Sequence, residues 1–182
     1  GDEIDNVVNE SVQALQDTAK LLDRALLEAA ALALHQAQSV QIYGVAASAI
    51  LWEYLHYKLL RLGKPAQMFS DMHRAAMNAT TLSKDTLVVA ISSSGSTRDL
   101  LHVVKLARKQ GARVLALSNT PRSPLASLSD IQLVAAKPEG PLSAGALNAK
   151  VGVMLLVELL TTSLIALDEK YSDVSQKTAS AT

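Results

Sequence analysis

The feature that most constrains the fold is a regular alternation between short runs of β-branched and aliphatic residues and longer stretches with helical spacing. Each short run has the length and character of a strand, and a helical pattern follows each one. Alternation of this kind is typical of parallel strands joined by crossover helices, with helices on both faces of one sheet. We therefore predict an α/β fold on a five-stranded parallel sheet. The expected strands are 40–43, 66–69, 86–91, 113–117 and 131–134.

The chain before the first strand is predicted to be helical. Residues 4–38 contain no Pro or Gly, and their apolar side chains recur three or four apart, which predicts two helices. The break between them falls either at Asp17–Thr18 or at Asp23. Further helices are expected at 48–62, 72–82, 97–110 and 147–167.

Three parts of the chain are expected. Residues 1–37 form an N-terminal helical segment that packs on the domain, and residues 38–168 form the α/β domain itself. Residues 169–182 are predicted to be a flexible C-terminal tail, because the stretch from Ser172 onward is rich in Ser, Thr and Ala.

Composition excludes several functions. The formal net charge is zero and the basic residues are scattered, so the chain itself is not expected to bind DNA. It has no Cys and four scattered His, which argues against a disulfide framework and a zinc site, and no metal or cofactor is expected. The absence of Cys suits a reducing cytoplasm. The start at Gly1 lacks an initiator Met and a signal-peptide pattern, so we expect an excised fragment.

The most apolar stretch is not expected to cross a membrane. Residues 151–167 fall short of the roughly 20 residues that a membrane helix requires, and Glu158 stands near their middle. Because this stretch is apolar nearly all round, it is predicted to be buried between the sheet and another subunit of a homodimer or tetramer.

The loop after the third predicted strand, Ser92-Ser93-Ser94-Gly95-Ser96-Thr97, has the chemistry of a phosphate site. Hydroxyl donors, a Gly that allows close approach and the N–H groups of a helix N-terminus all favour an anion. The alternative is a capping box, with Ser96 as N-cap and Asp99 reaching back. That alternative leaves Ser92 and Ser94 unexplained. Because the chain carries neither Gly-x-x-x-x-Gly-Lys nor Gly-x-Gly-x-x-Gly, a nucleotide is not expected.

A second loop follows the first predicted strand, at Gly44–Ser48. In a parallel sheet it lies at the same edge as the Ser-rich loop, so it would bring the Ser48 hydroxyl to the same place. Taken alone, it is equally well an ordinary Gly turn followed by a Ser N-cap.

These loops carry a resemblance to a known family. Gly-x-x-x-Ser at 44–48, Ser-x-Ser-Gly-x-Thr at 92–97 and Ala-Leu-Ser-Asn-Thr-Pro-x-Ser-Pro-Leu at 116–125 resemble SIS domains, the sugar isomerase phosphosugar-binding fold, over about residues 38–168. The segments 9–15 and 69–73 look most like the effector domains of RpiR-type bacterial transcription regulators, in which a helix-turn-helix domain precedes the SIS domain. The resemblance implies a flavodoxin-like three-layer sandwich.

The resemblance also implies roles for individual residues. Ser92, Ser94 and Thr97 would donate hydroxyls to the phosphate, Ser93 would add backbone or side-chain contacts, and Ser48 would face the sugar. Glu139 would lie near the sugar hydroxyls or the reacting carbon, unless it is only a solvated loop carboxylate. His73 is either a ligand-contacting residue or a surface residue.

The expected function is that of a sensor without catalytic residues. It would bind a phosphorylated sugar or sugar acid and act on DNA only through an absent N-terminal domain. The alternative is a SIS-type aldose-ketose isomerase with Glu139 or His73 as base. Isomerases of this fold often have Glu where this chain has Ser96, and Ala46 replaces a common Gly, so the isomerase is disfavoured. A third possibility is an assembly module without a ligand.

Overall fold

The structure, a computed structural model, describes residues 2–137 and 147–182. Its centre is a five-stranded, wholly parallel sheet of order β2-β1-β3-β4-β5. The fold class is confirmed, and each predicted strand lies within one residue of an observed one. The strands are β1 (Ser39–Gly44), β2 (Ala66–Phe69), β3 (Thr86–Ile91), β4 (Arg113–Ser118) and β5 (Ile131–Val134).

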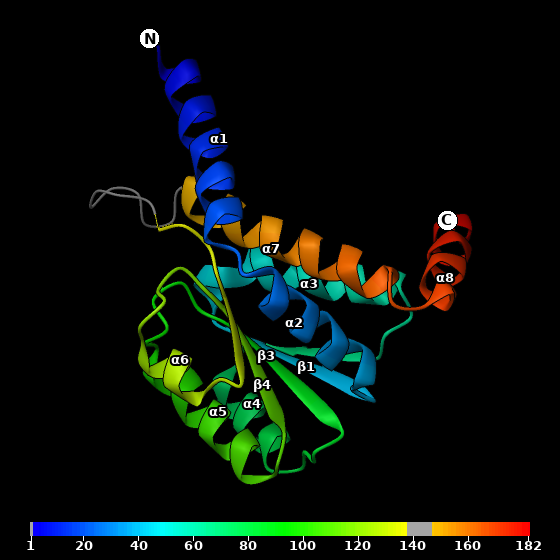
Figure 1. Cartoon of the computed structure of the whole chain (residues 1–182). Coiled ribbons are helices and arrows are strands. Elements are labelled where there is room, and N and C mark those ends of the chain that lie inside the picture. Colours follow the sequence, from blue (N-terminus) through cyan, green and yellow to red (C-terminus); the bar gives the residue numbers. More distant parts are fainter. Residues whose placement is uncertain (1, 138–146) are drawn as a thin grey trace.

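Helices cover both faces of the sheet, giving three layers (Figure 1). Neighbouring residues of a strand point to opposite faces, so Val89 packs against one helical layer and Val88 against the other. The first layer contains α2 (Arg24–Gln36), α3 (Ala49–Arg61) and α7 (Leu147–Ile165), with α1 (Glu3–Leu21) packed on α7. The second contains α4 (Met72–Ala79), α5 (Arg98–Lys109) and α6 (Pro124–Leu128).

The first two helices meet at Asp23. The Asp23 carboxylate accepts hydrogen bonds from Ala25 N at 2.8 Å and Leu26 N at 3.2 Å, which caps α2. Of the two predicted breaks, the one at Asp23 is confirmed, whereas Asp17–Thr18 lies inside α1. Thr18 is fully buried, and its Oγ1 accepts a hydrogen bond from Ala136 N, which joins α1 to the chain that follows β5.

The predicted flexible tail is instead a helix, α8 (Glu169–Ser180). Asp168 caps its first turn, and Tyr171 is buried and contacts His35 Nδ1 through its hydroxyl at 2.8 Å. Arg61 donates hydrogen bonds to Thr178 Oγ1 and to the Ser175 carbonyl. Composition alone suggested disorder, but these tertiary contacts hold the segment in place.

Helix α7 is, among the described helices, the one long and apolar enough to cross a membrane by length and composition, with a mean hydropathy of 1.5. This is weak evidence, because the core helix of a soluble protein has the same properties. One side of α7, including Leu156 and Leu160, is buried in the core of the first layer.

The sheet order also predicts where a ligand binds. The chain runs from β1 outward to β2 and then returns to β3 on the other side of β1. In doubly wound sheets the crevice at such a reversal, beyond the carboxyl ends of the strands, is the usual ligand site.

Candidate functional site

A pocket of about 420 Å³ lies at this crevice. It contains five of the predicted site residues: Ser48, Ser92, Ser93, Ser94 and Thr97. The structure thus brings together the two loops that the sequence placed at one edge of the sheet. The full described lining is Val45, Ala47, Ser48, Leu51, Ser92, Ser93, Ser94, Thr97, Asn119, Thr120, Lys137, Ala149 and Lys150.

The loop after β3 is shaped by its own hydroxyls. Gly95 N donates to Ser92 Oγ at 3.0 Å, and Ser96 N donates to Ser94 Oγ at 3.1 Å. Because both serine oxygens accept these bonds, the protons of the two hydroxyls remain available for another acceptor. Gly95 adopts φ of +65°, a left-handed conformation that favours Gly.

The N-terminus of α5 opens onto the same loop. Its N-cap is Thr97, and no side chain of the described residues accepts a hydrogen bond from the first turn. The capping-box alternative, with Ser96 as N-cap, is therefore wrong. Free N–H groups at a helix start, together with the positive end of the helix dipole, are well suited to a phosphate or carboxylate.

The loop after β4 braces the loop after β3. The Ser93 carbonyl accepts hydrogen bonds from Asn119 N and from Thr120 Oγ1, both at 3.0 Å. Leu125 N donates to the Gly95 carbonyl at 3.0 Å. A Cβ on Gly95 would stand 2.2 Å from Ser123 Oγ, so a larger residue there would collide with this brace.

The loop after β1 is held by a side chain of the helix that follows it and by one from far along the chain. Ser48 is buried at the end of a short 3-10 turn, and its N–H donates to the Val45 carbonyl at 2.9 Å. The indole of Trp52 lies against Gly44, and its Nε1 donates to the same Val45 carbonyl at 3.2 Å. Lys150, in the first turn of α7, donates from Nζ to the Ala47 carbonyl at 2.8 Å.

Two lysines make the described lining cationic. Lys137 follows β5 and Lys150 begins α7, and the described lining residues include no carboxylate and no histidine. The sequence analysis missed both lysines, as well as Asn119 and Thr120. Residues 118–120 belong to the motif that carried the family resemblance, which was the available signal for the last two. No motif or spacing in the sequence indicated that the two lysines would line the pocket.

Two predicted residues are not brought to the described pocket. His73 is exposed in the first turn of α4, after β2, and is not among the lining residues. Glu139 lies outside the described residues, so its role remains a prediction. The described residues contain no group of three or more His, Cys, Asp or Glu that could hold a metal ion.

The negative charge of Glu158, inside the apolar stretch of α7, is balanced by neighbouring side chains. Glu158 accepts hydrogen bonds from the Tyr54 hydroxyl and from Lys58 Nζ, which also forms an ion pair with it at 3.0 Å. The hydrogen bond to Glu158 raises the pKa of Tyr54 to about 12 and lowers the pKa of the Glu158 carboxyl. None of these three residues lines the pocket, and the cluster belongs to the contact between α3 and α7.

The sheet order, the hydroxyl loops and the open start of α5 define an α/β domain with a pocket at its switch point whose chemistry suits an anion. The family model for the SIS domain matches residues 33–163, and the chain belongs to this family.

The curated relatives of this chain include helix-turn-helix regulators. The chain is 30% identical, over 94% of its length, to an uncharacterised HTH-type transcriptional regulator of Caldanaerobacter subterraneus, and 26% identical, over 97%, to the HTH-type transcriptional regulator RpiR of Escherichia coli. It spans 60% of the length of both relatives. Among solved structures it matches Vibrio vulnificus NanR complexed with ManNAc-6P, with a TM-score of 0.95 and 47% identity over 100% of this chain and 69% of that one.

Proposed function

We propose that this chain is the phosphosugar-sensing effector domain of an RpiR-type bacterial transcription regulator, acting in the cytoplasm. Its ligand is a phosphorylated sugar or sugar acid, whose phosphate sits in the loop Ser92–Thr97. The observation that carries this proposal is the arrangement of two hydroxyls, Ser92 and Ser94, whose oxygens accept bonds from the loop while their protons are free to donate to a phosphate.

The rest of the pocket fits the sugar part of such a ligand. Ser48 and Thr120 offer hydroxyls from two other loops, and Lys137 and Lys150 add positive charge. NanR of Vibrio vulnificus, 47% identical, was solved with ManNAc-6P, so this compound is the first to test on the present chain. Glu139 and His73 remain predicted ligand contacts.

Control of DNA belongs to a helix-turn-helix domain outside this chain. A ligand shifts an equilibrium only if it binds two arrangements with different affinity. The loops after β1, β3 and β4 and the start of α7 meet in the pocket, so occupancy acts directly on α7, on which α1 packs. Helix α1 is the N-terminal helix of this chain and is the natural path to a preceding domain.

Isomerisation is the second candidate. Moving a proton between adjacent sugar carbons requires a base within reach of those carbons. Of the two candidate bases, His73 is not among the described lining residues and Glu139 lies outside the described residues. Because isomerases of this fold often have Glu where this chain has Ser96, we propose binding without turnover.

A thermal-shift titration tests the proposal. ManNAc-6P and a panel of hexose, pentose and sugar-acid phosphates are titrated against the wild-type chain, Ser94→Ala and Ser172→Ala, which removes an exposed hydroxyl on α8. A specific ligand at a hundredfold excess over its Kd stabilises the native state by about 2.7 kcal/mol. We expect the shift to survive in Ser172→Ala and to be lost in Ser94→Ala.

Two results would overturn it. The absence of any shift at millimolar concentration would remove the phosphate-sensing function and favour an assembly module. Chromatography of the sugar phosphates tests for turnover. If the wild-type chain converts an aldose phosphate to a ketose phosphate, it is an isomerase.

A further inference from the structure

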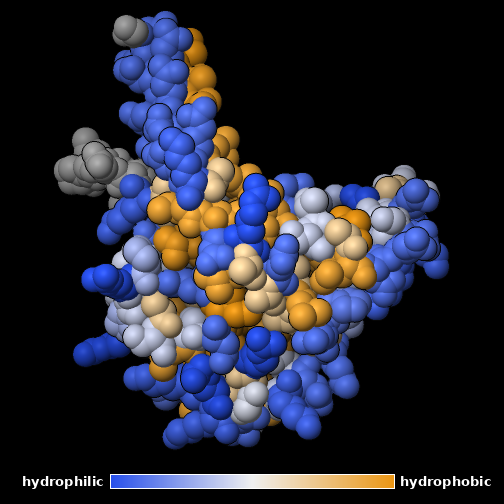
Figure 2. All heavy atoms as spheres, in the orientation of Figure 1, coloured by the Kyte–Doolittle hydropathy of each residue, from blue (hydrophilic) through white to orange (hydrophobic). Residues whose placement is uncertain are grey.

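Helix α1 is attached to the domain through few buried side chains. Of its described residues, Ala14 and Thr18 alone are buried. Figure 2 shows that the first turns of α1 stand clear of the domain, whereas its last turns rest on it. Segments with few buried contacts open at a lower cost in free energy than the core does. The docking of α1 therefore depends on a small contact, and Thr18 is the polar residue within it.

Three segments of the chain meet at Thr18. Thr18 is fully buried, and a Cβ on Gly152 of α7 would stand 2.6 Å from Thr18 Oγ1 and 3.1 Å from the Cβ of Ala135. Glycine at position 152 therefore allows α1, α7 and the chain after β5 to approach one another closely. Figure 1 shows the chain after β5, in yellow, passing the C-terminal end of α1.

The Thr18 hydroxyl forms hydrogen bonds in two directions. It donates to the Ala14 carbonyl of its own helix at 2.7 Å and accepts from Ala136 N at 3.0 Å. The next residue along the chain, Lys137, lines the pocket. Because Ala136 N would lose its acceptor if α1 moved away, the position of the chain beside Lys137 depends on α1.

Asn119 joins the same segment to the loop Ser92–Thr97. Its Nδ2 donates to the Ala136 carbonyl at 3.0 Å and to the Ala149 carbonyl at 3.3 Å. Its backbone N–H donates to the Ser93 carbonyl at 3.0 Å. Because both protons of Nδ2 are used in this way, Asn119 acts as a link and not as a donor to a ligand. Ala136 is thus bonded through its N–H to α1 and through its carbonyl to the pocket.

We propose that Thr18 is a positioning residue that couples the docking of α1 to anion binding in the loop Ser92–Thr97. The path runs through Ala136 and Asn119 to the Ser93 carbonyl. The inference rests on the proposed function, because it requires an anion in that loop. Coupling of this kind is reciprocal: if docked α1 raises the affinity for the anion by some factor, a bound anion favours docked α1 by the same factor. Occupancy of the pocket then holds in place the helix that, in the proposed regulator, follows the DNA-binding domain.

Thr161 provides a matched control for Thr18. It is also a fully buried threonine, but its hydroxyl contacts the Val157 and Glu158 carbonyls of its own helix, α7. It lies about three turns along α7 from Ala149, where Asn119 is bonded. Substitution of Thr161 therefore removes a buried hydroxyl without touching the path.

A double-mutant cycle in the ligand-free chain tests the path. Thr18→Val keeps the shape of the side chain but leaves Ala136 N without an acceptor, and Asn119→Ala removes the link at the other end. The unfolding constants come from urea denaturation. Because the second substitution costs less once the first is made, the unfolding constant of the double variant should be at least about fivefold below the product of the two single increases. Thr161→Val combined with Asn119→Ala should give the product within about twofold. Agreement with the product in both cycles would overturn the proposal.

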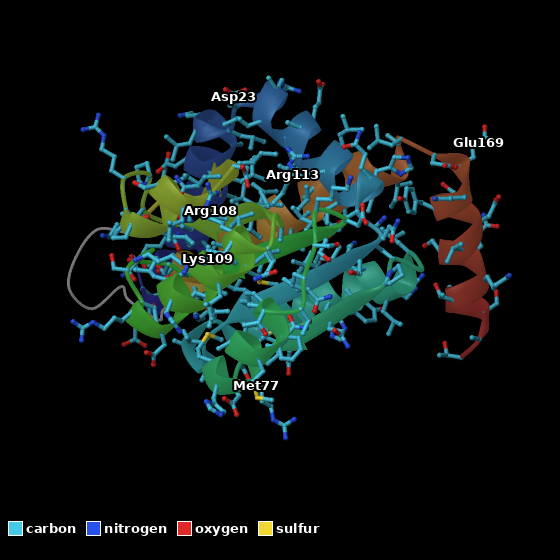
Figure 3. The ribbon with its side chains drawn as sticks, turned by 90° about the horizontal axis from the view of Figure 1, so that it is seen from below. Asp23, Met77, Arg108, Lys109, Arg113 and Glu169 are labelled. Atoms are coloured by element: carbon cyan, nitrogen blue, oxygen red, sulfur yellow. The ribbon has the colours of Figure 1, made fainter. Side chains whose placement is uncertain are left out.

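Hydrogen exchange measures the coupling to anion binding, with inorganic phosphate as the probe. At a phosphate concentration about tenfold above its Kd, exchange in the second half of α1 should slow by about tenfold in the wild type, Thr18→Ser and Thr161→Val. In Thr18→Val the slowing should be less than about twofold, while the loop Ser92–Thr97 is protected in all four proteins. Helix α8 is the internal control, and its exchange should not change. It begins at Glu169, well away from Asp23 at the junction of α1 and α2 (Figure 3).

The exchange results separate this inference from the proposed function. Protection of the loop Ser92–Thr97 without protection of α1 in the wild type would overturn the coupling and leave the proposed function intact. Equal slowing of α1 in Thr18→Val and in the wild type would show that another contact carries the coupling, so that Thr18 is not its positioning residue. If phosphate protects neither segment, the anion site itself is contradicted, and the proposed function fails together with this inference.

Discussion

The loops after β1 and β3 flank the same pocket but are held in place by different means. The loop after β3 is shaped by hydrogen bonds from its own backbone to Ser92 and Ser94 and by the left-handed Gly95. The loop after β1 depends on Trp52 and on Lys150, which lies 103 residues further along the chain than the carbonyl that it binds. A site can therefore combine one wall that is shaped mainly by its own residues, with a brace from the loop after β4, and another that also needs a lysine 103 residues further along the chain.

The largest expected effect on stability comes from a substitution at Gly95, in the loop after β3. Gly95→Ala adds the strain of a left-handed Ala and a Cβ 2.2 Å from Ser123 Oγ, and we expect a loss of about 3 kcal/mol or more in the free energy of unfolding. Gly111→Ala is the matched control, since φ is +88° but the nearest atom to its Cβ is 3.7 Å away.

Urea denaturation of both variants measures the difference. Gly111→Ala reports the backbone strain alone, which we expect to cost about 1 kcal/mol. Equal losses in the two variants would mean that Ser123 moves aside freely, and that the loop after β4 does not brace the loop after β3. We also expect Gly95→Ala to abolish the ligand-induced thermal shift.

The two serines of the loop provide the next prediction. Ser92 is 2% exposed, and Ser92→Ala leaves Gly95 N without its acceptor in a buried place, so we expect a loss of about 1–3 kcal/mol. Ser94 is exposed, so water replaces its hydroxyl on Ser96 N, and Ser94→Ala should change the stability by about 0.5 kcal/mol or less.

Ligand affinity tests the role of these two hydroxyls in binding, separately from their role in stability. Both variants are expected to bind the sugar phosphate at least about tenfold more weakly, because each loses a donor to a charged acceptor. Calorimetric titration measures this. If Ser94→Ala binds as tightly as the wild type, its proton is not directed at the phosphate and the site reduces to Ser92 and the start of α5.

The sequence predicted those parts of the structure that rest on local patterns. All five strands, the helix start at Asp23, which was one of two predicted positions, and the Ser-rich loop have residue types whose local preferences agree with the fold. The loop at 44–48 was ambiguous as a sequence, because Lys150, one of the two residues that hold it, lies 103 residues after Ala47. The family resemblance, and not the spacing of its residues, identified it as part of a site.

What could not be predicted depends on tertiary contacts. Lys150 was indistinguishable from any Lys at a helix start until α7 was placed beside the loop after β1. The segment at 169–182 was predicted to be flexible because the stretch from Ser172 onward is rich in Ser, Thr and Ala. This helix is stabilised by Tyr171 in the core and by Arg61 on α3. Neither contact can be predicted from the sequence of the segment itself.

The smallest expected effect concerns the loop that is held from a distance. Lys150→Met keeps the length of the side chain but removes the hydrogen bond to the Ala47 carbonyl. Because Lys150 is only partly buried, the stability should change by about 0.5 kcal/mol or less. The loop itself should loosen, and Trp52 reports this change, since it is the only Trp of the chain and its indole bonds to Val45 of that loop.

Fluorescence of Trp52 therefore tests the comparison between the two loops directly. We expect acrylamide to quench Trp52 more efficiently in Lys150→Met than in the wild type, and equally in the wild type, in Ser94→Ala and in Lys177→Met, an exposed control on α8. Ligand should reduce quenching in the wild type, because it fills the space between the loops. Equal quenching in Lys150→Met and Lys177→Met would show that Trp52 and the Gly44 turn hold the loop without help from α7. In that case the loop after β1 would be held by residues near it in the sequence and would not depend on Lys150.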